Sequence, residues 1–291
     1  MVSPATRAGT GDHMPREATQ ATTLTVQGVE IPKLGLGTWQ MTGRACEEAV
    51  RDALALGYRH IDTARMYGNE AEVGRGLSAS GVDRGEVFLT TKLLPQNLRA
   101  AEVRRQLSGS LAQLRTEYVD LLLIHWPSPD GVPLAETLGA MRELQEAGCV
   151  RHLGVSNFPA KMAREALELA PVICDQVEYH PFLGQPALLQ LARERDLMIT
   201  AYSPLAQGAT MHDPLLRDIA EAHGRNPAQV VLRWLLDQPQ VAAVPKASSH
   251  EHRAANLDIF DFELTDEQRG AIAGLQRGER TIDPSWAPDW D

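Results

Sequence analysis

The chain has 291 residues, of which 43% are hydrophobic and 23% are charged. This composition is typical of a globular protein and excludes a disordered or fibrous one, and the length suits a single (β/α)8 barrel. The formal net charge of -10 argues against a protein that binds nucleic acid through a broad basic face.

The cysteines and the N-terminus narrow the cellular context. Cys46, Cys149 and Cys174 are widely spaced and form no CxxC pair, so we expect neither a disulfide framework nor a metal site. Residues 1–21 have no apolar core of a signal peptide and no periodicity, and we interpret them as a disordered leader or a cloning remnant. No stretch of about 18 apolar residues occurs, so we expect a cytoplasmic protein without a membrane span.

From Thr22 onward the sequence predicts one domain, residues 22–291, of repeated βα units. Residues 22–32 read as a β-hairpin that turns at Gln27-Gly28, precedes the barrel and plugs its bottom. Short apolar runs then predict eight strands, alternating with amphipathic stretches. The predicted strands are residues 34–37, 59–62, 87–91, 119–125, 152–155, 172–178, 198–202 and 241–244.

The apolar spacing between these runs is helical. The first such stretch has Cys46, Ala49, Val50, Ala53 and Leu54 on one face and is expected to stop at Gly57. Residues 121–124 are apolar at every position, which is typical of a strand covered on both faces in a parallel sheet. The sequence therefore predicts a (β/α)8 TIM barrel.

Four polar residues stand at or just after the ends of predicted strands: Asp62, Tyr67, Lys92 and His125. A parallel barrel gathers its strand ends at one mouth, so these side chains can meet around one substrate. Each also has a purely structural explanation, since Asp62 could cap a turn, Tyr67 could pack, Lys92 could form an ion pair and His125 could be a hydrogen-bonded core histidine. Their combination favours acid-base chemistry.

In order and in local context, these four residues resemble the Asp, Tyr, Lys and His tetrad of the aldo-keto reductase superfamily. The resemblance extends over residues 22–291 and includes LGLGTW at 34–39, GVSNF at 154–158, QVEYHP at 176–181, AYSPL at 201–205 and VPK at 244–246. Few residues separate His125 from the helix expected near Leu134. In this short connection the chain resembles the compact bacterial 2,5-diketo-D-gluconate reductases. The resemblance implies a barrel whose C-terminal tail covers the mouth.

The resemblance implies NAD(P)H-dependent reduction of a carbonyl compound with Tyr67 as the proton donor. A tyrosine titrates near about 10, so bringing its pKa to neutrality needs about 4 kcal/mol, which an ammonium about 4 Å away can supply at an effective dielectric of about 20. Lys92 is the expected source of that charge. Asp62 would orient Lys92 and His125 would orient the substrate oxygen, and we expect Asp62 and His125 to be buried.

No GxGxxG motif follows a predicted strand, so the barrel itself would have to bind the cofactor. By resemblance, the nicotinamide and pyrophosphate would lie against Thr38, Ser156, Asn157, Gln176, Tyr202, Ser203, Leu205 and Gln207. The adenosine 2'-phosphate would lie against Lys246, Ser248, Ser249, His252, Arg253 and Asn256.

The residues at 246–256 favour NADPH, because cationic groups there suit a phosphate. Ala247 and His252 depart from the serine and arginine that are common in the family, so NADH use is also possible. A solvated run of charges is the alternative interpretation of the same stretch.

The substrate pocket is expected to be aromatic. Trp39 and Trp126 follow strand ends and Trp286 lies in the C-terminal tail, and with Met66 and Phe158 they could form an apolar wall, although core packing is the competing explanation. The expected partner is a small carbonyl compound, neither nucleic acid nor a membrane is expected to bind, and a monomer is the default.

Two other functions fit part of the sequence. A lysine at a barrel strand end can form a Schiff base in an aldolase. Some relatives of this barrel serve as cofactor-binding redox-sensing or regulatory subunits.

Overall fold

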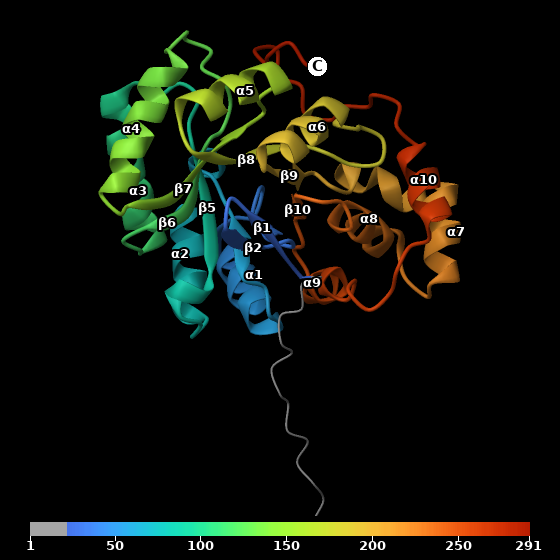
Figure 1. The fold of residues 1–291 in the computed structure, drawn as a ribbon. Helices are drawn as coiled ribbons and strands as arrows, with labels where there is room; N and C mark the ends of the chain where they lie inside the picture. The colour runs from blue at the N-terminus through green and yellow to red at the C-terminus, as the bar shows by residue number, and fades with distance from the viewer. Residues whose placement is uncertain (1–21) are drawn as a thin grey trace, which may run out of the picture.

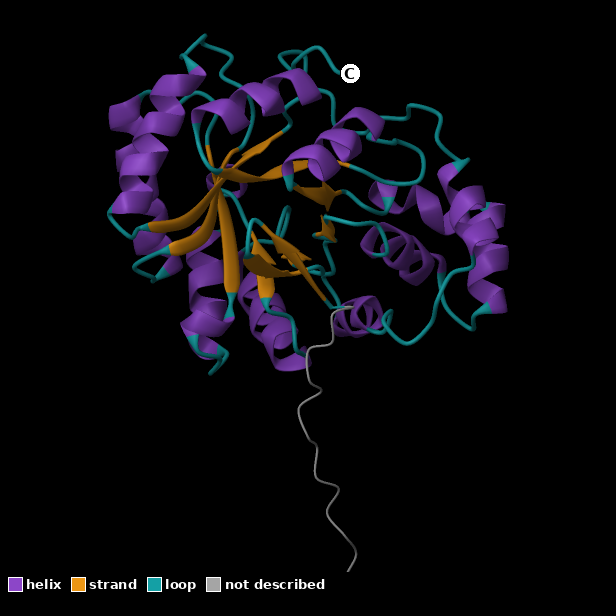
Figure 2. Cartoon of the chain, viewed as in Figure 1, coloured by secondary structure: helices purple, strands orange, loops and turns teal. Residues whose placement is uncertain are grey.

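The computed structural model describes residues 22–291, and the leader expected at 1–21 lies outside them. Eight parallel strands form one sheet with the spatial order β3 to β10, and helices surround it (Figures 1 and 2). The strands are β3 (Leu36–Gly37), β4 (His60–Asp62), β5 (Phe88–Leu93), β6 (Val119–Ile124), β7 (Val150–Ser156), β8 (Val172–Glu178), β9 (Met198–Tyr202) and β10 (Val241–Ala243).

The sheet closes into a barrel between its first and last strands. Leu34 and Gly37 form parallel bridges to Ala243 and Lys246. Gly35 N–H donates to Ala243 O at 2.9 Å, and Gly37 N–H donates to Pro245 O at 3.0 Å. The predicted (β/α)8 barrel is therefore confirmed, and all eight predicted strands are present. β5 ends two residues later than expected, so Lys92 lies inside a strand.

At least one helix follows each strand. The helices are α1 (Gly43–Leu56), α2 (Glu70–Ala79), α3 (Ala100–Leu114), α4 (Leu134–Glu146), α5 (Ala160–Leu169), α6 (Pro186–Arg195), α7 (Pro214–Ala222), α8 (Pro227–Leu236), α9 (His250–Leu257) and α10 (Asp266–Ala273). None of the helices within residues 22–291 combines the length and the apolar character needed to cross a bilayer.

Local sequence signals explain where helices begin and end. The five residues predicted for the inner face of α1 are all buried, and Gly57 ends the helix with a left-handed φ of 111°. Asn226 and Gln229 form a reciprocal capping box at the start of α8, where Pro227 occupies the first turn.

The hairpin of β1 (Thr23–Val26) and β2 (Val29–Pro32) lies at the bottom of the barrel. Its Leu24, Val26 and Ile31 pack with Phe88 and Met198, which begin β5 and β9. Gln27 and Gly28 make the turn, with φ values of 49° and 79°. The apolar plug blocks this end, so a ligand reaches the barrel interior from the other end, where the strands have their C-termini.

Candidate active site

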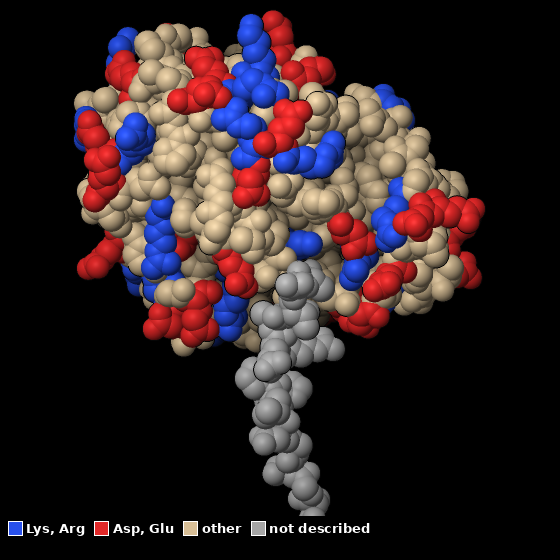
Figure 3. Space-filling view, viewed as in Figure 1, with Lys and Arg blue, Asp and Glu red and all other residues tan. Residues whose placement is uncertain are grey.

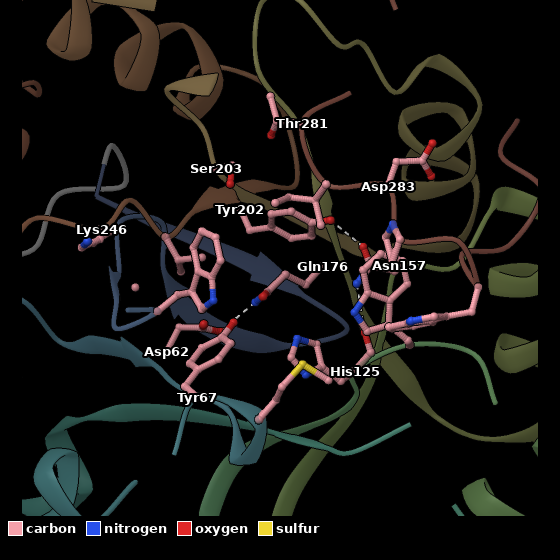
Figure 4. A pocket seen from close by; sticks show the side chains of 18 residues that line it. Asp62, Tyr67, His125, Asn157, Gln176, Tyr202, Ser203, Lys246, Thr281 and Asp283 are labelled. Carbon is pink, nitrogen blue, oxygen red and sulfur yellow. Dashed lines mark hydrogen bonds between the residues drawn. The ribbon is translucent and has the colours of Figure 1, made fainter. Parts of the chain in front are cut away.

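The carboxyl ends of the strands surround a cavity of about 430 Å³ at the mouth of the barrel (Figure 4). Side chains at or just after the ends of seven of the eight strands and from the C-terminal tail (residues 277–291) meet there. The lining residues are Gly37, Trp39, Asp62, Met66, Tyr67, His125, Trp126, Asn157, Gln176, Tyr202, Ser203, Val244, Lys246, Thr281, Ile282, Asp283, Pro284 and Trp286.

Lys92 links Asp62 to Tyr67, so three of the four tetrad residues are joined by hydrogen bonds. Its Nζ donates to Asp62 Oδ1 at 2.6 Å and to Tyr67 Oη at 3.2 Å. A third hydrogen bond goes to Thr63 O at 2.9 Å. Lys92 is fully buried, so its ammonium group is desolvated and acts on these neighbours without screening by water. Asp62 is buried as expected.

The loop that carries Tyr67 is held from both sides. Asn69 Nδ2 donates to Thr38 O and Met41 O, and Thr63 Oγ1 donates to Asn69 Oδ1. These bonds tie the loop after β4 to the loop after β3. Gly68 allows the turn with a φ of 66°, and the phenol of Tyr67 projects into the cavity. Thr38, expected at the cofactor, is fully buried in this bracing network and does not line the cavity.

The expectation that the pKa of Tyr67 falls toward neutrality is wrong for this structure. Burial of the phenol raises its pKa, the charge of Lys92 lowers it in part, and Asp62 raises it again, so the net direction is upward. Tyr67 is therefore a neutral acid at pH 7. Burial is the largest single influence and lowers the pKa of Lys92, but the charges of Asp62 and Tyr67 and the hydrogen bonds to both together outweigh it, so the pKa of Lys92 is raised overall. Lys92 therefore remains an ammonium group.

His125 is a neutral, buried imidazole beside Tyr67. Its pKa is held well below the ordinary value by burial and then by the charge of Lys92. Its ring stands edge-on to the ring of Tyr67, with centroids 5.7 Å apart. Its buried Nδ1 has no hydrogen-bond partner within residues 22–291. His125 can thus offer a polar ring nitrogen next to the phenol without competing as a charged acid.

Four residues expected at the nicotinamide form a connected network. Tyr202 Oη donates to Asn157 Oδ1 at 2.7 Å, and Asn157 Nδ2 donates to His125 O at 2.9 Å. Gln176 Nε2 donates to Asp62 Oδ2 at 2.8 Å, which links this network to the tetrad. Ser156 Oγ donates to Gln176 O and lies behind the cavity wall, so Ser156 braces the network and does not line the cavity.

The loop after β9 has an unusual backbone that sequence analysis did not find. Ser203, Ala206 and Gln207 all have left-handed φ values, of 46°, 46° and 52°. Such conformations cost energy for residues other than glycine and cluster at ligand-binding loops. Ser203 lines the cavity, whereas Leu205 packs against the core and Gln207 is exposed away from it. The Gln207-Gly208 pair is the feature of the sequence that could have indicated a turn with positive φ values here.

The stretch 246–256 differs in part from the expected phosphate grip. Lys246 is exposed at the cavity, while Ser248 and His252 face solvent and Ser249 caps α9.

Arg253 is buried, and its guanidinium group is already engaged. Its Nε donates to Asp52 Oδ2 at 2.8 Å and its Nη1 donates to Ala247 O at 2.9 Å. Asn256 is also buried. The guanidinium group of Arg253 is therefore paired with Asp52 on α1, and its role at the 2'-phosphate stays a prediction.

The substrate end of the cavity is apolar, but one of the residues expected there does not line it. Trp39, Met66, Trp126 and Trp286 line the cavity as expected, and the Trp126 and Trp286 rings meet edge-on with centroids 5.1 Å apart. Phe158 does not line this cavity, because its side chain is fully buried in the core between the barrel and the helices.

The part of the tail that forms the cavity wall was not predicted from the sequence. Thr281, Ile282, Asp283 and Pro284 line the cavity beside Trp286. They carry no local motif, and the N–H groups of Thr281 and Ile282 are held at the mouth by Glu178, about one hundred positions earlier in the chain.

The comparisons with known proteins agree with this geometry. The sequence model of the aldo/keto reductase family matches residues 33–277. An aldo-keto reductase of Mycolicibacterium vanbaalenii is 42% identical over 86% of this chain and 90% of its own length. Methylglyoxal reductase DkgB of Escherichia coli O157:H7 is 37% identical over 90% of this chain and 99% of its own length.

The solved structures give the same result. A crystal structure provisionally assigned as a 2,5-diketo-D-gluconic acid reductase B is 44% identical and superposes with a TM-score of 0.91. The match covers 94% of this chain and 99% of that one.

The chain belongs to the aldo/keto reductase family and is an oxidoreductase that acts on carbonyl compounds. Within the family it is similar to the bacterial 2,5-diketo-D-gluconate reductases, as its sequence motifs indicate.

Proposed function

We propose that this protein reduces aldehydes or ketones to alcohols with NADPH, and that Tyr67 donates the proton to the carbonyl oxygen. The observation that carries the proposal is the hydrogen-bond chain from Asp62 through Lys92 to Tyr67 Oη at the floor of the cavity. A neutral phenol that lies 3.2 Å from a buried ammonium group can release its proton, because the ammonium stabilises the phenolate that forms.

The other two tetrad residues support this step. Asp62 accepts from Lys92 and from Gln176, which fixes the direction of the ammonium group. The neutral imidazole of His125 can hydrogen-bond the substrate oxygen and aim it at Tyr67 Oη. The apolar wall of Trp39, Trp126 and Trp286 excludes water, which strengthens these interactions.

The residues at the cavity fit a nicotinamide cofactor, which supplies the hydride when it is bound. Asn157 and Gln176 present amide groups that match a carboxamide, and the ring of Tyr202 offers a stacking surface. Ser203 and the loop after it would lie along the pyrophosphate. Lys246, with Ser248, Ser249 and His252, would hold the 2'-phosphate. The engagement of Arg253 by Asp52 weakens that grip, so we expect NADPH to be preferred and NADH to be accepted.

The structure argues against the Schiff-base alternative. A lysine must be neutral to attack a carbonyl carbon, but the pKa of Lys92 is raised by Asp62 despite burial. Its Nζ already makes three hydrogen bonds and does not line the cavity.

The substrate class follows from the apolar wall of the cavity and from the activity in the name of a relative, methylglyoxal reductase. α-Oxoaldehydes such as methylglyoxal and aromatic aldehydes both suit a small apolar cavity with one polar end. The experiment is a set of initial rates with NADPH and NADH on methylglyoxal, 4-nitrobenzaldehyde and a keto-sugar. We expect carbonyl-dependent oxidation of both cofactors, with a higher kcat/KM for NADPH. Trapping of substrate on Lys92 by borohydride, without cofactor oxidation, would contradict the proposal.

A further inference from the structure

One buried carboxylate holds the middle of the C-terminal tail at the barrel mouth. Glu178 is the last residue of β8 and has no exposed surface. Its Oε1 accepts the N–H of Thr281 at 2.8 Å and also the hydroxyl of Thr281, and its Oε2 accepts the N–H of Ile282 at 3.0 Å. Both oxygens of the carboxylate therefore bind the tail.

The two ends of the tail are anchored elsewhere. Phe182 O accepts the N–H groups of Arg277 and Glu279. At the far end, Ala160 N–H donates to Asp291 Oδ2. Between these anchors, the hydrogen bonds that join residues 281–286 to the described barrel all go to Glu178. The middle segment is the part that lines the cavity, and Glu178 supplies its hydrogen bonds to the barrel, beside the packing of Trp286 on Trp126.

The neighbours of Glu178 make it a rigid anchor. His180 Nε2 lies 3.1 Å from Glu178 Oε1, and His180 is also completely buried. Gln185 Nε2 donates to the backbone carbonyl of Glu178 at 2.7 Å. A carboxylate that accepts several hydrogen bonds in a dry environment has little freedom to move.

We propose that Glu178 is a positioning residue that sets the substrate wall of Thr281–Pro284 and Trp286, and thereby the affinity for carbonyl compounds that reach this wall. The inference rests on the proposed reductase function. Glu178 does not line the cavity, so it does not touch the substrate itself.

The proposal predicts a dependence on substrate size. A small α-oxoaldehyde reacts at Tyr67 and His125 without needing the tail. An aromatic aldehyde with its carbonyl at Tyr67 extends its ring toward the Trp126–Trp286 pair, and Trp286 belongs to the tail. Displacement of the tail should therefore weaken binding of the aromatic substrate selectively.

The test compares three variants of the full-length protein. Glu178→Gln keeps the size of the side chain but replaces one acceptor oxygen with an NH₂ group that faces an N–H donor. Thr281→Val removes the hydroxyl from the tail side and leaves the barrel untouched, so it remains informative if Glu178→Gln folds poorly. Glu279→Gln is the matched control, because Glu279 lies on the same tail but pairs with Arg277 at the surface.

Steady-state kinetics with saturating NADPH give the first readout. We expect Glu178→Gln to raise KM for 4-nitrobenzaldehyde about tenfold, the equivalent of one charge-assisted hydrogen bond, with a smaller rise in Thr281→Val. In Glu178→Gln, KM for methylglyoxal, kcat for both substrates and the affinity for NADPH should stay within about twofold of wild type. Equal losses for both substrates, a loss of NADPH affinity or no change in KM would overturn the proposal.

Hydrogen exchange gives a readout that does not depend on turnover. The amides of Thr281 and Ile282 should exchange about tenfold faster in Glu178→Gln than in wild type or Glu279→Gln, because their acceptor is weakened. Unchanged exchange would show that Glu178 does not hold the tail. If the wild type reduces no carbonyl compound, the proposed function fails, while exchange and the binding of 4-nitrobenzaldehyde, followed by tryptophan fluorescence, still decide the role of Glu178.

Discussion

At the scale of single residues, the tetrad is a buried electrostatic unit whose members depend on one another. Lys92 and Asp62 are both buried and lie 2.6 Å apart. The sequence predicted this pairing because both residues match the tetrad of the aldo-keto reductase superfamily in order and in local context. It did not predict the net rise in the pKa of Tyr67, because the burial of a phenol depends on residues from the whole barrel mouth.

Replacing Lys92 with methionine tests this coupling. Asp62 would be left as a buried charge without its partner, so Lys92→Met should lower the free energy of unfolding by about 3–5 kcal/mol and lower kcat/KM by about 10²–10⁴-fold. The double variant Asp62→Asn/Lys92→Met should recover much of the stability in urea denaturation but none of the activity. Lys161→Met, on the exposed face of α5, is the control. Recovery of activity in the double variant would contradict the role of Lys92.

Asp175 is a second buried carboxylate, outside the tetrad, and it predicts a pH effect. It is fully buried, and neither of its oxygens has a hydrogen-bond partner within residues 22–291. Burial raises its pKa well above the ordinary value, the nearby amide of Phe158 offsets this in part, and Asp291 raises it further. A group with a raised folded pKa stabilises the fold at low pH and loses that contribution as pH rises through the folded value.

Asp175→Asn should therefore stabilise the protein at neutral pH, by about 1–3 kcal/mol, because the amide cannot ionise. The difference from wild type should shrink toward about pH 4, where the carboxyl group of the wild type is protonated. Thermal unfolding from pH 4 to 8 measures this, with Asp130→Asn on an exposed loop as the control. A variant less stable than wild type at pH 7 would show that the charge of Asp175 is satisfied.

At the scale of elements, the order and type of the strands follow from the sequence, but the contacts between distant elements do not. The apolar runs predicted every barrel strand because each is covered on both faces. The ion pair between Arg253 and Asp52 could not be predicted from the sequence, because Asp52 lies 201 positions earlier in the chain. Phe158 was misplaced because residues just past a strand end can turn either to the cavity or to the core.

Barrel closure between β3 and β10 requires a glycine. A Cβ at Gly37 would lie 2.5 Å from Val244 O, which belongs to the backbone and cannot move freely. Gly37→Ala should therefore destabilise the protein by about 1–3 kcal/mol. Gly139→Ala, in the exposed part of α4 where nothing lies within 4 Å, should instead stabilise it by about 0.5–1 kcal/mol. Urea denaturation of both variants is the measurement, and equal effects would contradict the steric account.

At the scale of the whole molecule, the barrel brings together at one mouth residues that are distributed over most of the chain. Acidic and basic side chains are interspersed on the face shown in Figure 3, so the net charge of -10 gives no continuous basic surface there. The hairpin closes the opposite end and the tail forms the outer wall of the cavity. The residues at the barrel mouth were predictable from strand-end motifs. The tail segment that lines the cavity was not predictable, because Glu178 binds it through backbone amides, which carry no sequence signature.

The central claim is that the phenol of Tyr67 delivers the proton in carbonyl reduction. Tyr67→Phe removes one oxygen atom and leaves the ring, the cavity wall and the residues expected at the nicotinamide in place. The decisive measurement is carbonyl-dependent NADPH oxidation by this variant together with its affinity for NADPH. The account predicts a loss of kcat of about 10²–10⁴-fold with NADPH affinity nearly unchanged. Retained turnover, or a loss of NADPH affinity equal to the loss of rate, would contradict it.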